Sequence, residues 1–437
     1  MSNSIKNNQE ILNKLGIEKL NPMQEEAHRV IAESNNIVLL SPTGTGKTLA
    51  FLLPIINNLD LDLHEVQALI LVPSRELAIQ IEQVVREMGS GFKANAIYGG
   101  RPMSIDKIEL SHPPAILIGT PGRIADHLRK ETFSIDFLET LILDEFDKSL
   151  EVGFEDEMSE ILDALPNIKK RVLTSATQEI KIPKFAGVKN EVYINYLDQG
   201  VSKLEIKTVI SPEKDKLNTL VELLNHLGDQ PGIIFCNFKD TIQRVSDHLN
   251  DMNIAHGCFY GGLDQKDRER ALIKFRNGTH KLIIATDLAA RGIDIPEMKF
   301  IIHYQLPLKS QEFTHRNGRT ARVDNNGTAY VLKWTKEELP EFIHPNTKTE
   351  ELTKNRSSEV NSWKTIFISG GRKDKISKGD IAGLFLKQGN LEKEQLGTIE
   401  LKQDCAFVSV PAELADLLIA KLNNTRLKKK KVRLNII

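Results

Sequence analysis

Short apolar runs alternate with amphipathic stretches over most of the chain, a pattern typical of strands separated by helices. The first series of runs spans residues 37–40, 68–72, 115–118, 141–143 and 172–173. The second series spans residues 206–210, 232–235, 281–285, 300–303 and 328–332. Near-continuous apolar runs between helices indicate parallel sheets that are covered on both faces. The sequence therefore predicts two tandem α/β domains.

A different pattern follows the second series. Residues 346–361 are polar, with almost no apolar periodicity, which is typical of a linker. Beyond them we expect helices after Ser377 and Pro411, and strands over 365–368, 396–401, 405–410 and 431–436. This βαββαβ order is ferredoxin-like and is used by RNA recognition modules. The predicted boundaries are 1–199 and 204–345 for the α/β domains, 346–361 for the linker and 362–437 for the last domain.

The composition is that of a soluble globular protein, with 40% hydrophobic and 27% charged residues among 437. No apolar run approaches the ~20 residues of a membrane span. The polar stretch 1–10 lacks the apolar segment of a signal peptide. The three cysteines have no metal-ligand spacing and are expected to be buried thiols. We expect a cytoplasmic protein.

Charge is distributed unevenly along the chain. The net charge is −1, yet residues 362–437 contain 15 Lys and Arg against 8 Asp and Glu. A basic C-terminal domain on an otherwise acidic chain indicates a polyanionic partner that is contacted at that end.

The segment Ser41–Thr48 reads S-P-T-G-T-G-K-T and lies between an apolar run and a segment of good helix formers. A strand, a glycine-bearing loop and a helix together hold nucleotide phosphates, through backbone N–H groups and the helix dipole. Lys47 would reach the β- and γ-phosphates, and Thr48 would ligate Mg²⁺. The alternative is an ordinary glycine-rich turn. The predicted ATP-binding residues of this loop are Ser41, Thr43, Gly44, Thr45, Gly46, Lys47 and Thr48.

The run Leu141–Leu143 ends in two carboxylates, within the sequence D-E-F-D. Adjacent side chains point in opposite directions if the strand continues. Asp144 could then hold Mg²⁺ through water, while Glu145 activates the attacking water. The alternative is a pair of acids at an ordinary strand-to-helix boundary.

Residues 10–345 resemble the DEAD-box RNA helicases of helicase superfamily two, because the phosphate loop, D-E-F-D, Ser175-Ala176-Thr177 and H-R-N-G-R-T-A-R occur in order. The resemblance implies that Gln24 reads adenine and that Asp294 contacts the ATP ribose. It also implies that ATP hydrolysis is coupled to RNA through Asp147, Ser175, Thr177 and His315. The RNA contacts it implies are Arg75, Gly100, Thr120, Gly122, Arg123, Gly262, Gln265, Arg268 and Thr286.

Arg319 and Arg322 are three residues apart, so they share a face if their segment is helical. Two guanidinium groups suit a γ-phosphate whose charge spreads during transfer, the role of an arginine finger. Because they belong to the second domain and Lys47 to the first, we expect catalysis only when the domains close. The alternative is a helix whose arginines pair with surface acids.

Residues 362–437 resemble the RNA-binding domain of DbpA-type DEAD-box proteins, through G-R-K-D-K at 371–375 and G-D-I at 379–381. The resemblance implies a structured large-subunit ribosomal RNA element as the target. Aromatic residues are scarce on the predicted strands, so we expect recognition of shape and phosphates rather than base stacking. The predicted contacts are Arg372, Lys373, Lys375, Lys428, Lys429, Lys430, Lys431 and Arg433.

We therefore interpret the chain as a monomeric ATP-dependent RNA helicase. Phe146 in place of the box alanine, and Asn7 where the family has a stacking aromatic, leave open an RNA-binding scaffold with an impaired ATPase. Asn317 also stands where an aliphatic residue is common. A DNA-directed enzyme of the same superfamily is a third alternative.

Overall fold

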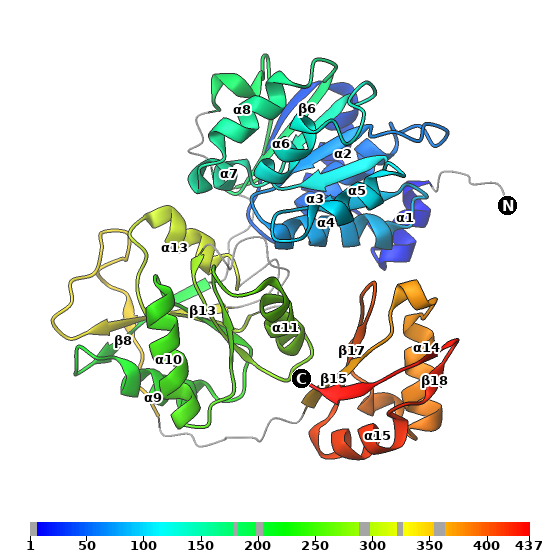
Figure 1. Ribbon diagram of the computed structural model, residues 1–437. Helices are drawn as coiled ribbons and strands as arrows, with labels where there is room; N and C mark the ends of the chain where they lie inside the picture. The colour runs from blue at the N-terminus through cyan, green and yellow to red at the C-terminus, as the bar shows by residue number, and fades with distance from the viewer. Residues whose placement is uncertain (1–6, 178–181, 198–203, 288–297, 321–326, 354–362) are drawn as a thin grey trace. The chain divides into compact units, whose positions relative to one another are not determined.

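The computed structural model describes residues 7–177, 182–197, 204–287, 298–320, 327–353 and 363–437. The chain forms two compact units whose main boundary falls between residues 202 and 203. The first unit contains one parallel sheet, and the second contains another parallel sheet and a C-terminal antiparallel sheet (Figure 1). No described helix is long and apolar enough to cross a bilayer.

The first unit is a seven-stranded parallel sheet in the order β3-β4-β2-β5-β6-β1-β7. Its strands are β1 (Asn36–Leu40), β2 (Ala68–Leu71), β3 (Ala94–Ile97), β4 (Ile116–Gly119), β5 (Thr140–Leu143), β6 (Lys170–Ser175) and β7 (Val192–Asn195). Its helices are α1 (Asn8–Leu15), α2 (Pro22–Glu33), α3 (Lys47–Ile56), α4 (Arg75–Met88), α5 (Met103–Leu110), α6 (Pro121–Arg129), α7 (Phe146–Val152) and α8 (Glu155–Asp163).

Both faces of this sheet are covered. Along β1, Ile37 and Leu39 enter one apolar core, whereas Val38 and Leu40 enter the other. Successive side chains of a strand point to opposite faces, so a strand buried on both sides must be apolar throughout. This explains the near-continuous apolar runs of the sequence.

The second unit begins with a sheet in the order β10-β11-β9-β12-β13-β8-β14. Its strands are β8 (Leu204–Ser211), β9 (Gly232–Phe235), β10 (Gly257–Phe259), β11 (Leu282–Ala285), β12 (Phe300–His303), β13 (Gly327–Trp334) and β14 (Lys348–Thr349). Its described helices are α9 (Leu217–Leu227), α10 (Lys239–Asp251), α11 (Gln265–Arg276) and α13 (Ser310–Asn317). Counted from each sheet's own first strand, the order is 3-4-2-5-6-1-7 in both sheets, so the two α/β domains share one topology.

The first part of the segment predicted as a linker contains a strand of the second parallel sheet. β14 lies within it and pairs with β8, and Glu350 accepts from Lys207 at 2.6 Å. His226 also contacts Thr353, at 2.9 Å. Residues 348–353 are therefore attached to the second parallel sheet, because backbone pairing and one acid hold a segment that has little apolar character.

The C-terminal domain is a four-stranded antiparallel sheet in the order β16-β17-β15-β20. Its elements are β15 (Trp363–Ile368), α14 (Lys378–Gly383), β16 (Ile399–Leu401), β17 (Ala406–Pro411), α15 (Ala415–Leu422), β18 (Arg426–Leu427), β19 (Lys430–Lys431) and β20 (Leu434–Ile436). The predicted βαββαβ order is confirmed, but the last strand is shorter than predicted. Lys430 and Lys431 pair with β18 in a small hairpin instead.

Candidate functional site

The phosphate-loop segment of the first unit folds around its own lysine. Gly44 and Gly46 both have φ of 84°, a left-handed conformation that favours glycine. Lys47, the first residue of α3, donates from Nζ to the carbonyl oxygens of Ser41 at 2.5 Å and Pro42 at 2.9 Å. These two carbonyl oxygens hold the Lys47 ammonium group inside the curve of the loop.

Gln24 braces this loop from α2. Its Oε1 accepts from the Asn21 backbone N–H at 3.0 Å, and its Nε2 donates to the Gly46 carbonyl at 3.2 Å. A Cβ atom on Gly46 would lie 2.4 Å from Gln24 Nε2, so the Gln24 amide would have to shift to admit any other residue. The position predicted to read adenine thus lies directly against the phosphate loop. Asn7, by contrast, caps α1 through the Glu10 backbone N–H at 2.9 Å.

The two carboxylates after β5 do not continue the strand, so their directions are not set by strand alternation. β5 ends at Leu143, and Glu145 has a φ of 48°, so a left-handed residue sets the direction of its side chain. Asp144 is buried and accepts from the Thr174 hydroxyl and, at 3.1 Å, from the Glu145 backbone N–H. Burial raises the pKa of Asp144, whereas the Thr174 hydrogen bond and the Lys47 charge act in the opposite direction.

The residues after this turn are also buried. Phe146 is 1% exposed and packs in the second apolar core of the sheet, so its ring has room. Asp147 lies 3.3 Å from the buried Lys148 ammonium. Ser175, at the end of β6, accepts from the Thr177 backbone N–H at 3.0 Å.

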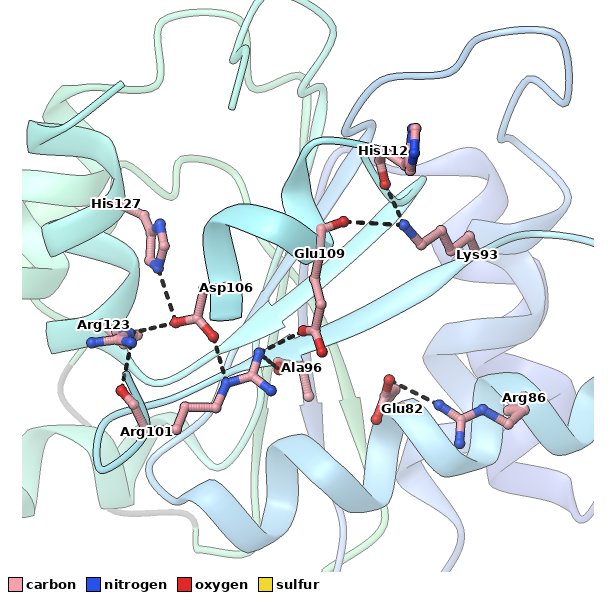
Figure 2. Close-up of polar contacts among 10 residues, drawn as sticks. All are labelled: Glu82, Arg86, Lys93, Ala96, Arg101, Asp106, Glu109, His112, Arg123 and His127. Carbon is pink, nitrogen blue, oxygen red and sulfur yellow. Dashed lines mark hydrogen bonds and ion pairs between the residues drawn. The ribbon is translucent and has the colours of Figure 1, made fainter. Parts of the chain in front are cut away.

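The predicted RNA contacts of the first unit lie at the carboxyl ends of the strands, as expected for a parallel sheet. Arg75 begins α4 and lies against Gly100, where a Cβ would be 2.4 Å from its Nη1. Thr120 and Gly122 flank the start of α6. Arg123 differs, because its Nε donates to buried Asp106 at 2.6 Å (Figure 2). No sequence motif marked Asp106.

In the second unit, the predicted RNA contacts follow two neighbouring strands. Gly262, with φ of 100°, follows β10, and Thr286 follows β11. Gln265 begins α11, and the Arg268 guanidinium lies 4.9 Å from the centre of the Phe259 ring. The fold therefore brings these residues to one edge of the sheet.

The predicted arginine fingers are not both on a helix. α13 ends at Asn317 and Gly318 caps it, so the buried Arg319 lies in the turn beyond the helix. Arg322 and Asp294 lie outside the described residues. His315 lies in the last turn of α13.

The neighbouring Arg316 is a buried hub that the sequence analysis did not assign to the site. It is 1% exposed and contacts the loops after three strands. Its guanidinium donates to both Asp287 oxygens at 2.6 and 2.5 Å, to the Gln305 carbonyl at 2.6 Å, and to Asn237 Oδ1 at 2.7 Å. Its sequence signal was its place as the second residue of the segment H-R-N-G-R-T-A-R, from which only His315, Arg319 and Arg322 were given roles.

Asn317 has a structural partner that explains a polar residue at this position. His303, at the end of β12, donates from Nε2 to Asn317 Oδ1 at 2.9 Å. Burial, with the nearby Arg316 charge, lowers the pKa of His303 to about 3. The imidazole is therefore neutral at pH 7, and Asn317 satisfies its buried N–H.

The basic residues of the C-terminal domain gather where two segments meet. Lys430 bonds Asp374 at 2.8 Å, and Arg433 donates its backbone N–H to Ser369 at 2.7 Å. Lys428 pairs with Asp380 at 3.0 Å. Hydrogen bonds from the Ser377 hydroxyl and backbone N–H, and then the Lys428 contact, lower the pKa of the Asp380 carboxyl to about 2. Two of the six lysines predicted to contact RNA, Lys428 and Lys430, therefore have acidic protein partners. The predicted basic residues that remain exposed are Lys373, Lys375, Lys428, Lys429, Lys431 and Arg433, of which Lys428 pairs with Asp380.

The open face of the C-terminal sheet is partly covered within the second unit. Thr365 contacts Thr279 at 2.7 Å, and the Ser409 hydroxyl donates to the Asn277 carbonyl at 2.7 Å. Glu400 accepts two hydrogen bonds from Arg276, at 2.7 and 2.9 Å. RNA recognition modules stack bases on this sheet face, so base stacking there is restricted.

Duplicated parallel sheets, one with a glycine-bearing phosphate loop and buried aspartate, define a nucleotide-hydrolysing protein of the two-domain helicase type. Residues 21–185 match the DEAD/DEAH box helicase family, residues 215–324 the helicase conserved C-terminal domain and residues 365–436 the DbpA RNA binding domain. The chain belongs to the DEAD-box family of ATP-dependent RNA helicases, and it is of the DbpA type.

Individual relatives support this assignment along nearly the whole chain. ATP-dependent RNA helicase DbpA of Bacillus subtilis is 30% identical, over 96% of this chain and 95% of the relative. DbpA of Escherichia coli is 31% identical, over 98% and 96% respectively. Among solved structures, S. cerevisiae Dbp5 bound to RNA and ADP BeF3 is 27% identical with a TM-score of 0.68, over 76% of this chain and 89% of that chain.

Proposed function

We propose that this helicase binds a structured element of large-subunit ribosomal RNA through its C-terminal domain and separates short duplexes nearby, during assembly of the large subunit. We also propose that it acts as a cytoplasmic monomer. The observation that carries the ribosomal target is the DbpA-type domain over residues 365–436, with its exposed basic residues on two adjoining segments.

The first unit contains a donor set that suits Mg²⁺. Thr48 offers a hydroxyl and Asp144 a buried carboxylate, and magnesium prefers oxygen ligands. Mg²⁺ bound there would neutralise phosphate charge during transfer. Lys47 would bind the β- and γ-phosphates, Glu145 would accept a proton from the attacking water, and Arg319 of the second unit would stabilise the transferring phosphoryl group.

The impaired scaffold is the weaker candidate. It rests on Phe146 and Asn7, and the Phe146 ring packs inside the second apolar core of the sheet. The family assignment also favours an active enzyme.

The deciding experiment compares ATP hydrolysis stimulated by a defined large-subunit ribosomal RNA fragment with that stimulated by bulk RNA and by DNA of the same sequence. A labelled short duplex attached to the fragment reports strand separation. We expect stronger stimulation by the fragment, together with ATP-dependent release of the strand. Equal stimulation by every RNA would reject the ribosomal target, and hydrolysis without strand release would reject unwinding.

Glu145→Gln tests the chemical step. We expect turnover to fall at least about 100-fold because proton transfer is lost, while ATP and RNA still bind. Glu155→Gln is the matched control, since Glu155 is an exposed acid at the start of α8. Turnover at the wild-type rate in Glu145→Gln would remove that residue from water activation.

The salt dependence of RNA affinity distinguishes basic residues that contact phosphate from basic residues that do not. Lys429→Ala should lower the slope of log affinity against log salt by about 1, because an exposed lysine that contacts phosphate releases one counterion. Lys428→Ala is the control, since Lys428 pairs with Asp380. Equal slopes for Lys429→Ala and wild type would assign Lys429 to a solvated turn.

A further inference from the structure

Helix α5 of the first unit buries a carboxylate while it exposes two large apolar side chains. Asp106 is fully buried, whereas Ile105 is 43% exposed and Ile108 is 71% exposed. Leu110, four residues after Asp106 on the same face, is buried in the second apolar core of the sheet. A buried carboxylate is unfavourable unless it is paired and hydrogen-bonded, so Asp106 can share this inward face only because of its contacts.

Asp106 joins three segments of the chain (Figure 2). Its Oδ2 accepts from Arg123 Nε at 2.6 Å and lies 3.1 Å from His127 Nε2, both on α6. Its Oδ1 forms an ion pair with Arg101, which follows Gly100 in the loop after β3. Arg123 also donates from Nη2 to the Arg101 carbonyl at 2.8 Å, so the two arginines are connected directly as well.

These contacts direct the Arg123 guanidinium into the protein. Its side chain is only 10% exposed, and Nε and Nη2 already have protein acceptors. A phosphate contact through Nε would require its hydrogen bond to Asp106 to break, and little of the rest of the side chain is open to solvent. The same contacts fix the spacing between the loop that contains Gly100 and the start of α6 at Thr120 and Gly122.

We infer that Asp106 is a positioning residue for RNA binding and that Arg123 acts through it rather than on a phosphate. This inference rests on the proposed RNA contacts of Gly100, Thr120 and Gly122. Asp106 holds the two loops that carry them in one arrangement, so the loops meet the sugar–phosphate backbone without rearranging.

A positioning role and a purely electrostatic role of Asp106 predict opposite changes in RNA affinity when its charge is removed. Removing an acid beside a polyanion site should tighten RNA binding if only the net field matters. Removing the residue that fixes the loops should weaken RNA binding. Glu109→Gln is the matched control, because Glu109 pairs with Arg101 at 2.6 Å but is 41% exposed and does not contact Arg123.

Asp106→Asn is tested in the full chain with a single-stranded oligouridylate and ATP. We expect the KM for RNA to rise about tenfold, the cost of a lost hydrogen bond to a charged group, with the KM for ATP and kcat at saturating RNA within about twofold. Glu109→Gln should leave the KM for RNA unchanged or slightly lower. An unchanged or lower KM for RNA in Asp106→Asn overturns the inference.

Arg123→Gln settles the outcome if Asp106→Asn fails to fold, because Asp106 keeps Arg101 and His127 in this variant. We expect weaker RNA binding with the wild-type salt slope. A slope reduced by about 0.7, the value for one phosphate contact on a single strand, or unchanged affinity overturns the inference. Wild-type enzyme without RNA-stimulated hydrolysis would instead reject the proposed function.

Discussion

The two parallel sheets have the same strand order, yet the buried charged residue that connects the loops at the carboxyl ends of the strands is an anion in one sheet and a cation in the other. In the first sheet the hub is an anion, Asp106, which contacts Arg101 and Arg123. In the second it is a cation, Arg316, which contacts Asp287 and Asn237. The topology supplies equivalent loop positions, and one buried ion in each domain then determines how those loops are arranged.

Arg316→Met should have the largest effect. Removing one partner of a buried ion pair leaves Asp287 and the carbonyls around it without a donor, at a cost of about 4 kcal/mol in the free energy of unfolding. Hydrogen exchange at β9 and β11 measures this loss. The control is Arg244→Met, since the exposed pair of Arg244 with Asp215 contributes at most about 1 kcal/mol. Equal protection in the two variants would show that Arg316 is no hub.

Asp106→Asn should cost about 3 kcal/mol in the free energy of unfolding of the first unit at pH 7. Hydrogen bonds from His127 and Arg123 outweigh burial and hold the Asp106 pKa below its ordinary 3.8. A depressed carboxyl pKa stabilises the fold above pH 3.8, and this stability is lost as the pH falls through the folded value.

The difference in the free energy of unfolding between wild type and Asp106→Asn should therefore be largest at neutral pH and should decrease only below pH 3.8. Urea unfolding at a series of pH values measures it. Asp126→Asn, which removes an exposed acid from α6, is the control. A difference that persists unchanged at the acid end would contradict a role for the Asp106 charge.

The loop after the first strand of each parallel sheet carries a lysine, and the two lysines can be compared for their effect on turnover. Lys47 begins α3, and Lys216 immediately precedes α9, where its Nζ donates to the Leu332 carbonyl at 2.8 Å. Lys47→Ala should lower turnover about 100-fold, equivalent to about 2.7 kcal/mol of activation free energy. Lys216→Met should change turnover less than about twofold, because no glycine-bearing loop surrounds it. Comparable losses would assign a catalytic role to both lysines.

Asn317→Leu should have the smallest effect, about 1 kcal/mol, because the buried His303 N–H loses its acceptor. The double variant His303→Phe/Asn317→Leu removes both polar partners and should recover part of that loss. Thermal unfolding of both variants gives the coupling energy. An additive result would show that the pair is not coupled.

The repeated sheets and the phosphate loop could be predicted because their signals are local. The apolar strands and the segment Ser41–Thr48 are each read within a few residues. Asp106 could not be predicted, since Ile105 and Ile108 indicate the wrong buried face and Arg123 is 17 residues away. The left-handed Glu145 was likewise hidden, because its conformation depends on packing rather than on residue type.

The basic surface of the C-terminal domain was predicted only in part. Counting lysines identified two basic segments that adjoin in the fold, but it could not separate Lys429 from Lys428 and Lys430, which have acidic partners. Asp374 is 56 residues before its partner Lys430, a distance over which sequence spacing carries no information. The fold decides which cations remain exposed.

Helix α11 has different contacts at its two ends. Gln265 and Arg268 lie in its first turn, among the proposed RNA contacts, and Arg276 at its last residue bonds Glu400 of the C-terminal sheet. Twelve residues span about 18 Å as a single rigid rod. A rigid helix moves as one body, so a displacement at one end also moves the other end. A shift of the RNA strand at one end of α11 would therefore pull on the C-terminal domain at the other.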